Sequence, residues 1–160
     1  MGSTSDLPVM EKACKWLDDN EIPFEVNALS AHRTPAAVEA FAKGAQERGI
    51  KVIIAAAGMA AALPGVIAAS TNLPVIGVPI KGMLDGLDAM LSIIQMPPGI
   101  PTATVGVNAA QNAAILAAQI IGLSDSAVAA KVAAHKAGLG AKIEKANKDL
   151  AEVKYNFKTN

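Results

Sequence analysis

The amino-acid sequence predicts one domain of the α/β class, in which helices cover both faces of a parallel sheet. Short apolar segments alternate with segments of helical periodicity along the 160 residues, which is typical of a parallel sheet with crossover helices. The apolar segments, such as Val52–Ala56, have no polar residue at alternate positions, as expected of strands buried on both faces. The chain is long enough for one core and too short for two ordinary domains. We expect residues 1–122 to form an α/β core and residues 123–160 a C-terminal helix.

The chain is predicted to begin with a helix and a strand. A small, polar segment, Gly2–Asp6, precedes apolar residues at helical spacing, and Ser5 or Asp6 can cap the helix that follows. After the turn that ends at Pro23, the residues Phe24–Ala28 predict a short strand. This strand leads into a polar segment that contains one of the two histidines.

Thr34 and Pro35 predict the start of a second helix, because a hydroxyl caps a helix and proline fits its first turn. Gly49 is expected to close this helix, and the remaining elements follow the same alternation. The sequence predicts strands over 52–56, 74–78 and 102–107, helices over 60–71, 85–95 and 109–121, and a rigid proline-rich connector over 96–101. A last helix should begin near Ser124–Ser126 and carry an apolar stripe of Val132, Leu139, Ile143, Ala146, Leu150 and Val153.

The composition excludes several classes of function. Formal net charge is zero and the two signs are interspersed, so nothing favours nucleic acid or an anionic membrane as a partner. No apolar run is long enough to span a membrane, and no signal peptide is recognisable. The single cysteine, Cys14, and the lack of clustered metal-ligand residues predict a cytoplasmic protein without an internal disulfide or a metal site. An apolar content of 52% with only 3% aromatic residues predicts a large self-association surface and hence a homo-oligomer.

A ligand site is expected where parallel strands end, at their carboxyl ends. His32 would lie there beside Ser30 and Arg33. An imidazole can carry a proton near neutral pH, and an arginine can bind a phosphate or a carboxylate through two hydrogen bonds. A surface loop that only starts a helix is an equally good interpretation of these residues. The other histidine, His135, lies among Ala, Val and Lys of the last helix, so we expect a solvated or interface residue there.

The polar start of the chain is a second candidate. The hydroxyls of Ser3 and Ser5 and free N–H groups at a helix start suit a phosphate, and the Asp6 carboxylate suits ribose hydroxyls. Simple capping of the helix is the favoured alternative for this segment taken alone. No Walker loop, Gly-x-Gly-x-x-Gly turn or Gly-x-Ser-x-Gly elbow occurs in the sequence.

Five motifs occur in order along the chain. They are Met-Gly-Ser-Thr-Ser-Asp over 1–6, Ser-Ala-His-Arg-Thr-Pro over 30–35, Leu-Pro-Gly over 63–65, Ser-Ile-Ile-Gln-Met-Pro-Pro-Gly-Ile-Pro over 92–101 and Asn-Ala-Ala-Ile-Leu-Ala-Ala-Gln over 112–119. Together they resemble the N5-carboxyaminoimidazole ribonucleotide mutase family of de novo purine synthesis, from residue 1 to about residue 122. His-Arg-Thr-Pro, rather than His-Lys-Thr, is similar to the mutase branch and not to the branch that uses free carbon dioxide.

The resemblance implies a flavodoxin-like, three-layer αβα sandwich that assembles as a homo-octamer and uses no metal or organic cofactor. It implies a ribonucleotide substrate, whose carboxylate moves from the exocyclic nitrogen of an aminoimidazole to a ring carbon. His32 would be the general acid and base. The substrate would be bound by the phosphate ligands Ser3, Ser30 and Arg33, by Asp6 on the ribose hydroxyls, by Ala57, Gly58 and Met59 around the base, and by Ser5, Ala31 and Leu63.

Three departures from the family pattern bear on these expectations. The family has a strand before Gly-Ser-x-Ser-Asp, and Met1 stands in its last position, so we expect the first strand to be missing and the phosphate loop to lose its anchor. Ala62 stands where the family has a second active-site histidine, and Gly82-Met83 replaces small polar residues. Two alternatives to a mutase stay open. One is a carboxylase that combines aminoimidazole ribonucleotide with free carbon dioxide, and the other is a catalytically impaired ribonucleotide-binding oligomer.

Overall fold

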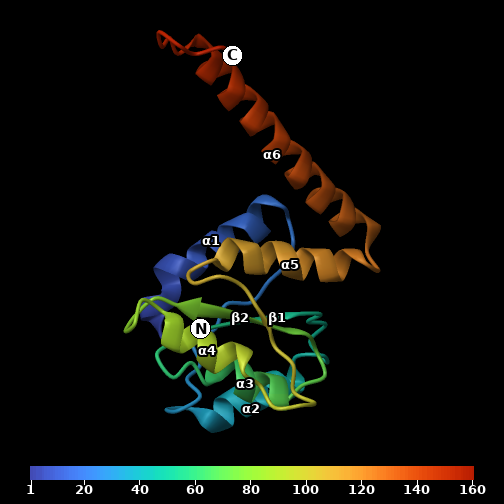
Figure 1. Cartoon of the computed structure of the whole chain (residues 1–160). Helices are drawn as coiled ribbons and strands as arrows, with labels where there is room; N and C mark the ends of the chain where they lie inside the picture. Colours follow the sequence, from blue (N-terminus) through green and yellow to red (C-terminus); the bar gives the residue numbers. More distant parts are fainter.

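The computed structural model describes all 160 residues and has three layers, with a sheet between two layers of helices (Figure 1). The strands are parallel and lie in the order β1-β2-β3, with β1 at Ile53–Gly58, β2 at Val75–Ile80 and β3 at Ala103–Thr104. A 3-10 turn over Thr4–Asp6 precedes the first helix. The helices are α1 Leu7–Asp19, α2 Pro35–Gly44, α3 Leu63–Ala69, α4 Leu87–Ile94, α5 Ala110–Gly122 and α6 Ser126–Glu152.

The two faces of the sheet bury separate apolar clusters. Ile53, Ala55 and Ala57 of β1 pack with α2, α3 and α4 on one face. Ala56 faces the other side, where α1, α5 and the start of α6 lie. All six residues of β2 are buried. This alternation confirms the prediction of strands buried on both faces and of a parallel sheet covered by helices.

Close packing brings α4 directly onto the backbone of β2. A Cβ atom placed on Gly77 would lie 2.3 Å from Cγ2 of Ile93 in α4, a separation that real atoms do not tolerate. Glycine at this position therefore allows the helix to approach the middle of the sheet.

The strand predicted over Phe24–Ala28 is absent, and that prediction was wrong. Residues 23–28 make only one backbone hydrogen bond, which the Asn27 carbonyl accepts from the Met1 amino group (2.9 Å). A strand needs a neighbour for its N–H and C=O groups, and a cavity separates this segment from β1. As a result, Phe24 and Val26 keep 42% and 51% of their surface exposed.

Three further elements differ from the prediction. The strand predicted over 102–107 has only two residues in the sheet, because the chain turns at Val107 and Asn108. The helix predicted over 60–71 begins later, at Leu63. Thr34 does not cap α2: its hydroxyl donates to the Ser30 carbonyl (3.1 Å) and accepts from the Ser30 N–H (3.0 Å).

The last helix, α6, extends away from the three layers (Figure 1). Asp125 caps it by accepting hydrogen bonds from the N–H groups of Ala127 and Val128. Nε1 of Trp16 donates to Nδ1 of His135 (3.2 Å), with the two rings edge to face, so His135 holds α6 against α1. Of the predicted apolar stripe, only Val132 is buried. None of the helices combines the length and hydropathy that a membrane crossing requires.

Candidate active site

A cavity of about 550 Å³ lies at the carboxyl ends of β1 and β2, where the topology of the sheet predicts a ligand site. Four segments line it: residues 2–6, 30–33, 57–63 and 80–82. The cavity brings together every residue proposed from the sequence, namely Ser3, Ser5, Asp6, Ser30, Ala31, His32, Arg33, Ala57, Gly58, Met59 and Leu63.

Arg33 connects two of these segments. Its Nε donates to the Ser30 hydroxyl (3.2 Å) and its Nη2 donates to the Gly2 carbonyl (3.0 Å). The Arg33 N–H also donates to the Ser30 hydroxyl (3.2 Å). The guanidinium is thereby fixed beside the start of the chain while the residue stays exposed, which suits it to bind an incoming anion.

The first six residues form the wall opposite Arg33. The Ser3 hydroxyl accepts from the Ser5 N–H (3.3 Å) and caps the 3-10 turn. The Asp6 carboxylate is only 8% exposed and accepts from the Ser5 hydroxyl (3.4 Å). Ser3 therefore caps the 3-10 turn, whereas the sequence predicted that Ser5 or Asp6 would cap the helix. Asp6 does stand at the N-cap of α1, but it makes no side-chain capping bond. The Asp6 side chain remains available for a ligand hydroxyl.

Met1 anchors this wall to both neighbouring segments. Besides the bond from its amino group to Asn27, its carbonyl accepts from the Leu29 N–H (2.8 Å), and the Gly2 N–H donates to the Ala56 carbonyl of β1 (3.0 Å). Burial lowers the pKa of the Met1 amino group, and the Asp6 carboxylate opposes this shift. The segment over residues 2–6 thus keeps an anchor, contrary to what the sequence led us to expect.

His32 lies on the open side of the cavity. It is exposed, and its ring makes no hydrogen bond within the chain. Both ring nitrogens are therefore free to accept and donate protons to a bound molecule. The His32 ring lies next to Arg33 in the sequence, and both residues line the same cavity, so a molecule bound to the Arg33 guanidinium would lie near the ring.

The segment after β1 passes beneath the cavity in a strained conformation. Met59 has a φ of 56° and Ala61 a φ of 35°, in the left-handed region that favours glycine. The Met59 side chain is 62% exposed. Ala62 lines the cavity at the N-cap of α3, where it offers no polar group to a ligand.

The sequence analysis missed Lys81 in this cavity. Lys81 follows β2 directly, its N–H donates to the Asn108 side chain (2.9 Å), and its Nζ pairs with Asp85 (3.0 Å). Its place three residues beyond the end of the strand predicted over 74–78 was the available signal. No group of three His, Cys, Asp or Glu residues anywhere in the chain could hold a metal ion.

Comparisons with known proteins agree with the motifs. The family model described as AIR carboxylase matches residues 1–142. N5-carboxyaminoimidazole ribonucleotide mutase of Pyrococcus horikoshii is 51% identical over 154 residues, which are 96% of this chain and 87% of that protein. Phosphoribosylaminoimidazole carboxylase of Saccharomyces cerevisiae is 57% identical over 133 residues, which are 82% of this chain but 23% of that protein.

The fold agrees as well. The crystal structure of Treponema denticola PurE matches with a TM-score of 0.83 and 30% sequence identity, and the match covers 94% of each chain. The flavodoxin-like, three-layer fold that the resemblance implied is therefore confirmed, with the long C-terminal helix and without the first strand. By its match over residues 1–142 and its identity to these relatives, the chain belongs to the AIR carboxylase family.

Proposed function

We propose that this protein is an N5-carboxyaminoimidazole ribonucleotide mutase of purine biosynthesis. The observation that carries the proposal is the convergence of His32, Arg33 and Asp6 on one cavity, in a chain whose relatives include named mutases. The substrate is a ribonucleotide, and its carboxylate moves from the exocyclic nitrogen to a ring carbon of the imidazole.

The phosphate and ribose bind to the two segments that Arg33 connects. A phosphate placed against Arg33, Ser3 and Ser30 meets a guanidinium and hydroxyl donors. The ribose hydroxyls then donate to Asp6, whose carboxylate is buried beside the turn. Charge-assisted bonds of this kind are stronger than neutral ones, so these groups supply orientation as well as affinity.

His32 moves the proton. As carbon dioxide leaves the exocyclic nitrogen, the imidazolium donates a proton to that nitrogen. The ring carbon then attacks the released carbon dioxide, and the neutral imidazole removes the proton from that carbon. One residue can serve both steps because an imidazole can both donate and accept a proton. Ala57, Gly58, Met59 and Leu63 surround the base, and apolar walls keep carbon dioxide near the carbon it must reach.

Two alternatives make different predictions. The relative from Saccharomyces cerevisiae is named a carboxylase, and a carboxylase would require free carbon dioxide. An impaired binding protein is motivated by Ala62, which leaves His32 as the only histidine in the cavity. It would bind the ribonucleotide without converting it.

The decisive experiment compares His32→Asn with His135→Asn. His135 is the matched control, since it is the only other histidine and contacts Trp16 on a different helix. We expect His32→Asn to lower the rate of carboxylate transfer by about 10²–10⁴-fold, and His135→Asn to preserve it. Interconversion of the two carboxylated ribonucleotides is followed with and without added bicarbonate.

The outcomes of this experiment distinguish the mutase from the carboxylase and from the impaired binding protein. Equal rates for the two variants would contradict the role of His32, and a rate proportional to added bicarbonate would indicate the carboxylase. Ribonucleotide binding with no turnover in the unmodified protein would indicate the impaired binding protein.

We also propose that the protein is a cytoplasmic homo-oligomer, an octamer as the resemblance implies, built from one domain over residues 1–160. Its support is the exposed apolar surface on α4 and α6, which includes Leu87, Leu91, Ile94, Leu139, Ile143 and Leu150. A monomeric mass in light scattering at micromolar concentration would contradict the assembly.

A further inference from the structure

The proposed ribonucleotide substrate carries a second anionic group besides its phosphate. The migrating carboxylate is attached to the exocyclic nitrogen before the reaction and to a ring carbon afterwards, so it lies beside the base in both molecules. Arg33 and the hydroxyls of Ser3 and Ser30 are assigned to the phosphate. A carboxylate that enters an apolar part of a cavity loses solvation, and a cation there would compensate for the loss.

Lys81 carries the only charge in the part of the cavity that surrounds the base. Two segments form this part, residues 57–63 and residues 80–82, and we call it the base end. Apart from Lys81, these segments contain only Ala, Gly, Met, Leu and Ile. Lys81 is therefore the cation that the base end offers to a carboxylate.

The order of the strands places Lys81 and Arg33 on opposite sides of β1. On one side, the Gly2 N–H donates to a carbonyl of β1 (3.0 Å), and Nη2 of Arg33 donates to the Gly2 carbonyl (3.0 Å). On the other side, Gly58 at the end of β1 is in register with Ile80 of β2, and Lys81 follows. Gly2 and β2 are about two strand spacings, or about 10 Å, apart. A ligand with an anionic group at each end would meet both cations.

The backbone of Lys81 is held in place by its neighbours. Its N–H donates to the Asn108 side chain (2.9 Å), and the Asn108 N–H donates to the Pro79 carbonyl (2.8 Å). A Cβ atom on Gly86 would lie 3.2 Å from Cα of Lys81 and 2.7 Å from Cγ1 of Val107, so the following loop folds back closely against Lys81. The ammonium therefore moves on a flexible stem that starts from a fixed position.

A ligand can replace the present partner of Lys81. Nζ of Lys81 lies 3.0 Å from the Asp85 carboxylate, and the two side chains are 58% and 87% exposed. Ion pairs as exposed as this one contribute little to stability. A ligand carboxylate held against the cavity wall would be less surrounded by water, so its attraction to the ammonium would be screened less.

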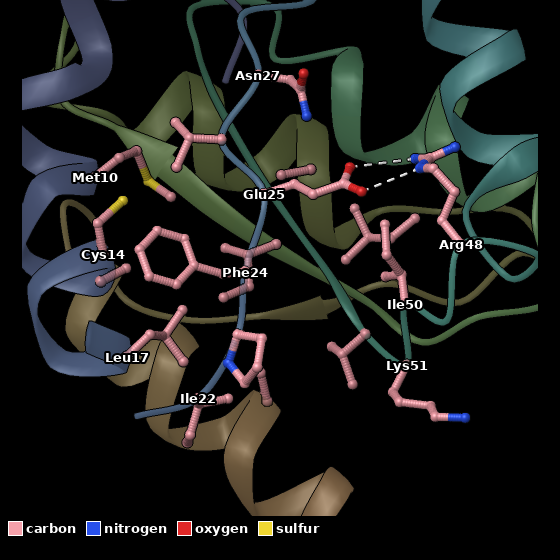
Figure 2. Close-up of a pocket in the computed structure, with 18 of the residues that line it drawn as sticks. Met10, Cys14, Leu17, Ile22, Phe24, Glu25, Asn27, Arg48, Ile50 and Lys51 are labelled. Carbon is pink, nitrogen blue, oxygen red and sulfur yellow. Dashed lines mark hydrogen bonds and ion pairs between the residues drawn. The ribbon is translucent and has the colours of Figure 1, made fainter. Parts of the chain in front are cut away.

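The other large cavity of the chain offers its cations differently. It has a volume of about 480 Å³ and lies beside β1 (Figure 2). Nε and Nη2 of Arg48 donate to the two carboxylate oxygens of Glu25 (3.1 and 3.4 Å), and the guanidinium lies over the Phe41 ring. In Figure 2, Lys51 extends away from this pair. Arg48 thus has two partners within the chain, whereas Lys81 has one exposed partner at the rim of its cavity.

We propose that Lys81 binds the carboxylate of the ribonucleotide and forms a second anion subsite in the candidate active site. This assignment rests on the proposed function, because it takes the base to lie against residues 57–59. The ammonium leaves Asp85 and pairs with the carboxylate on the exocyclic nitrogen before the transfer and on the ring carbon after it. Carbon dioxide is uncharged and does not pair with it. Lys81 therefore binds both carboxylated ribonucleotides and takes no part in moving the proton.

The test compares two ribonucleotides that differ only in the carboxylate, 4-carboxy-5-aminoimidazole ribonucleotide and 5-aminoimidazole ribonucleotide. Calorimetry measures their affinities for the full chain and for Lys81→Met, which keeps an unbranched stem and removes the charge. We expect Lys81→Met to weaken binding of the carboxylated ligand about 10–100-fold and binding of the other ligand less than about twofold. Lys81→Arg keeps the positive charge and should restore most of the affinity.

Two control variants separate the charge of Lys81 from its place in the loop. Lys15→Met removes the lysine of a matched i,i+4 pair with Asp19 (2.9 Å) on α1, outside the cavity, and should leave both affinities unchanged. Asp85→Asn removes the partner and keeps the ammonium, so the carboxylated ligand should bind equally well or more tightly. A loss in Asp85→Asn as large as in Lys81→Met would show that the pair only holds the loop. That result, or an equal loss of both ligands in Lys81→Met, would overturn the proposal.

Turnover of the same proteins separates this assignment from the mutase function. We expect Lys81→Met to raise KM about tenfold or more and to change kcat less than about threefold, because Lys81 binds substrate and product alike. Turnover by the unmodified protein with no change of KM in Lys81→Met would support the mutase and overturn the role of Lys81. Binding without turnover in the unmodified protein would contradict the mutase, and the two affinities would still decide the role of Lys81.

Discussion

Met59 has a backbone conformation that its side chain disfavours, at the point where the cavity wall leaves β1. A left-handed conformation costs a residue with a Cβ atom about 1–2 kcal/mol, whereas glycine adopts it freely. We therefore expect Met59→Gly to raise the free energy of unfolding by about 0.5–1 kcal/mol, after subtracting the greater entropy that glycine has in the unfolded chain. Urea unfolding measures the change.

Met83→Gly is the control for this prediction. Met83 is also exposed and also lies in a loop at the rim, but it has no positive φ. Its replacement should lower the free energy of unfolding, because only the entropic effect remains. A loss of stability in both variants would show that the φ of 56° at Met59 stores no strain.

At the scale of single residues, the sequence analysis found the candidate site because its members are local. Ser30, His32 and Arg33 are consecutive or nearly so, and their position was predicted from the end of a strand over Phe24–Ala28 that the structure does not form. Lys81 was missed because it has no polar neighbour of its own in the sequence. Only the meeting of β1 and β2 at one rim brings it to the cavity.

At the scale of elements, Gly77 tests how closely α4 must approach the sheet. A methyl group at Gly77 would meet Cγ2 of Ile93 at 2.3 Å, so either the helix or the strand must shift. We expect Gly77→Ala to lower the free energy of unfolding by about 1–3 kcal/mol. In α6, a Cβ on Gly138 would meet nothing within 4 Å, so Gly138→Ala should raise helix stability by about 0.5–1 kcal/mol.

Chemical unfolding of both glycine variants, followed by circular dichroism, distinguishes packing from propensity. If Gly77→Ala were as mild as Gly138→Ala, then α4 would have room to move and the close approach would not constrain the core.

The strands show why a sequence predicts some elements and not others. The segments at 52–56 and 74–78 formed strands because each has a partner in register. The segment Phe24–Ala28 alternates apolar and polar residues, a pattern that also predicts a strand, yet it lies beside a cavity and its backbone pairs only with Met1. Strand formation depends on a neighbour, which is a property of the assembled sheet and not of the segment.

At the scale of the whole molecule, Met1 connects three parts of the chain. Its amino group, its carbonyl and the following N–H bond to Asn27, to Leu29 and to Ala56 of β1. The candidate active site depends on this junction, because the Gly2 carbonyl also accepts from Arg33. The charge state of the amino group should therefore influence the stability of the entire fold.

This dependence predicts a particular pH profile. Burial lowers the pKa of the Met1 amino group, so just below pH 8 the unfolded chain binds more protons there than the folded chain does. The free energy of unfolding should therefore rise with pH up to about 8, the ordinary pKa of an α-amino group. Burial raises the pKa of the Cys14 thiol, so the free energy of unfolding should fall again above about pH 8.5.

Nα-acetylation of Met1 tests this profile. It keeps an N–H for the Asn27 carbonyl but removes the charge, so the acetylated protein should lose the amino group's part of the rise below pH 8. Because both histidines are present in both proteins, the difference between their unfolding curves isolates the amino group. A difference that stays constant between about pH 6 and 9 would mean that the Met1 charge is solvated in the folded protein.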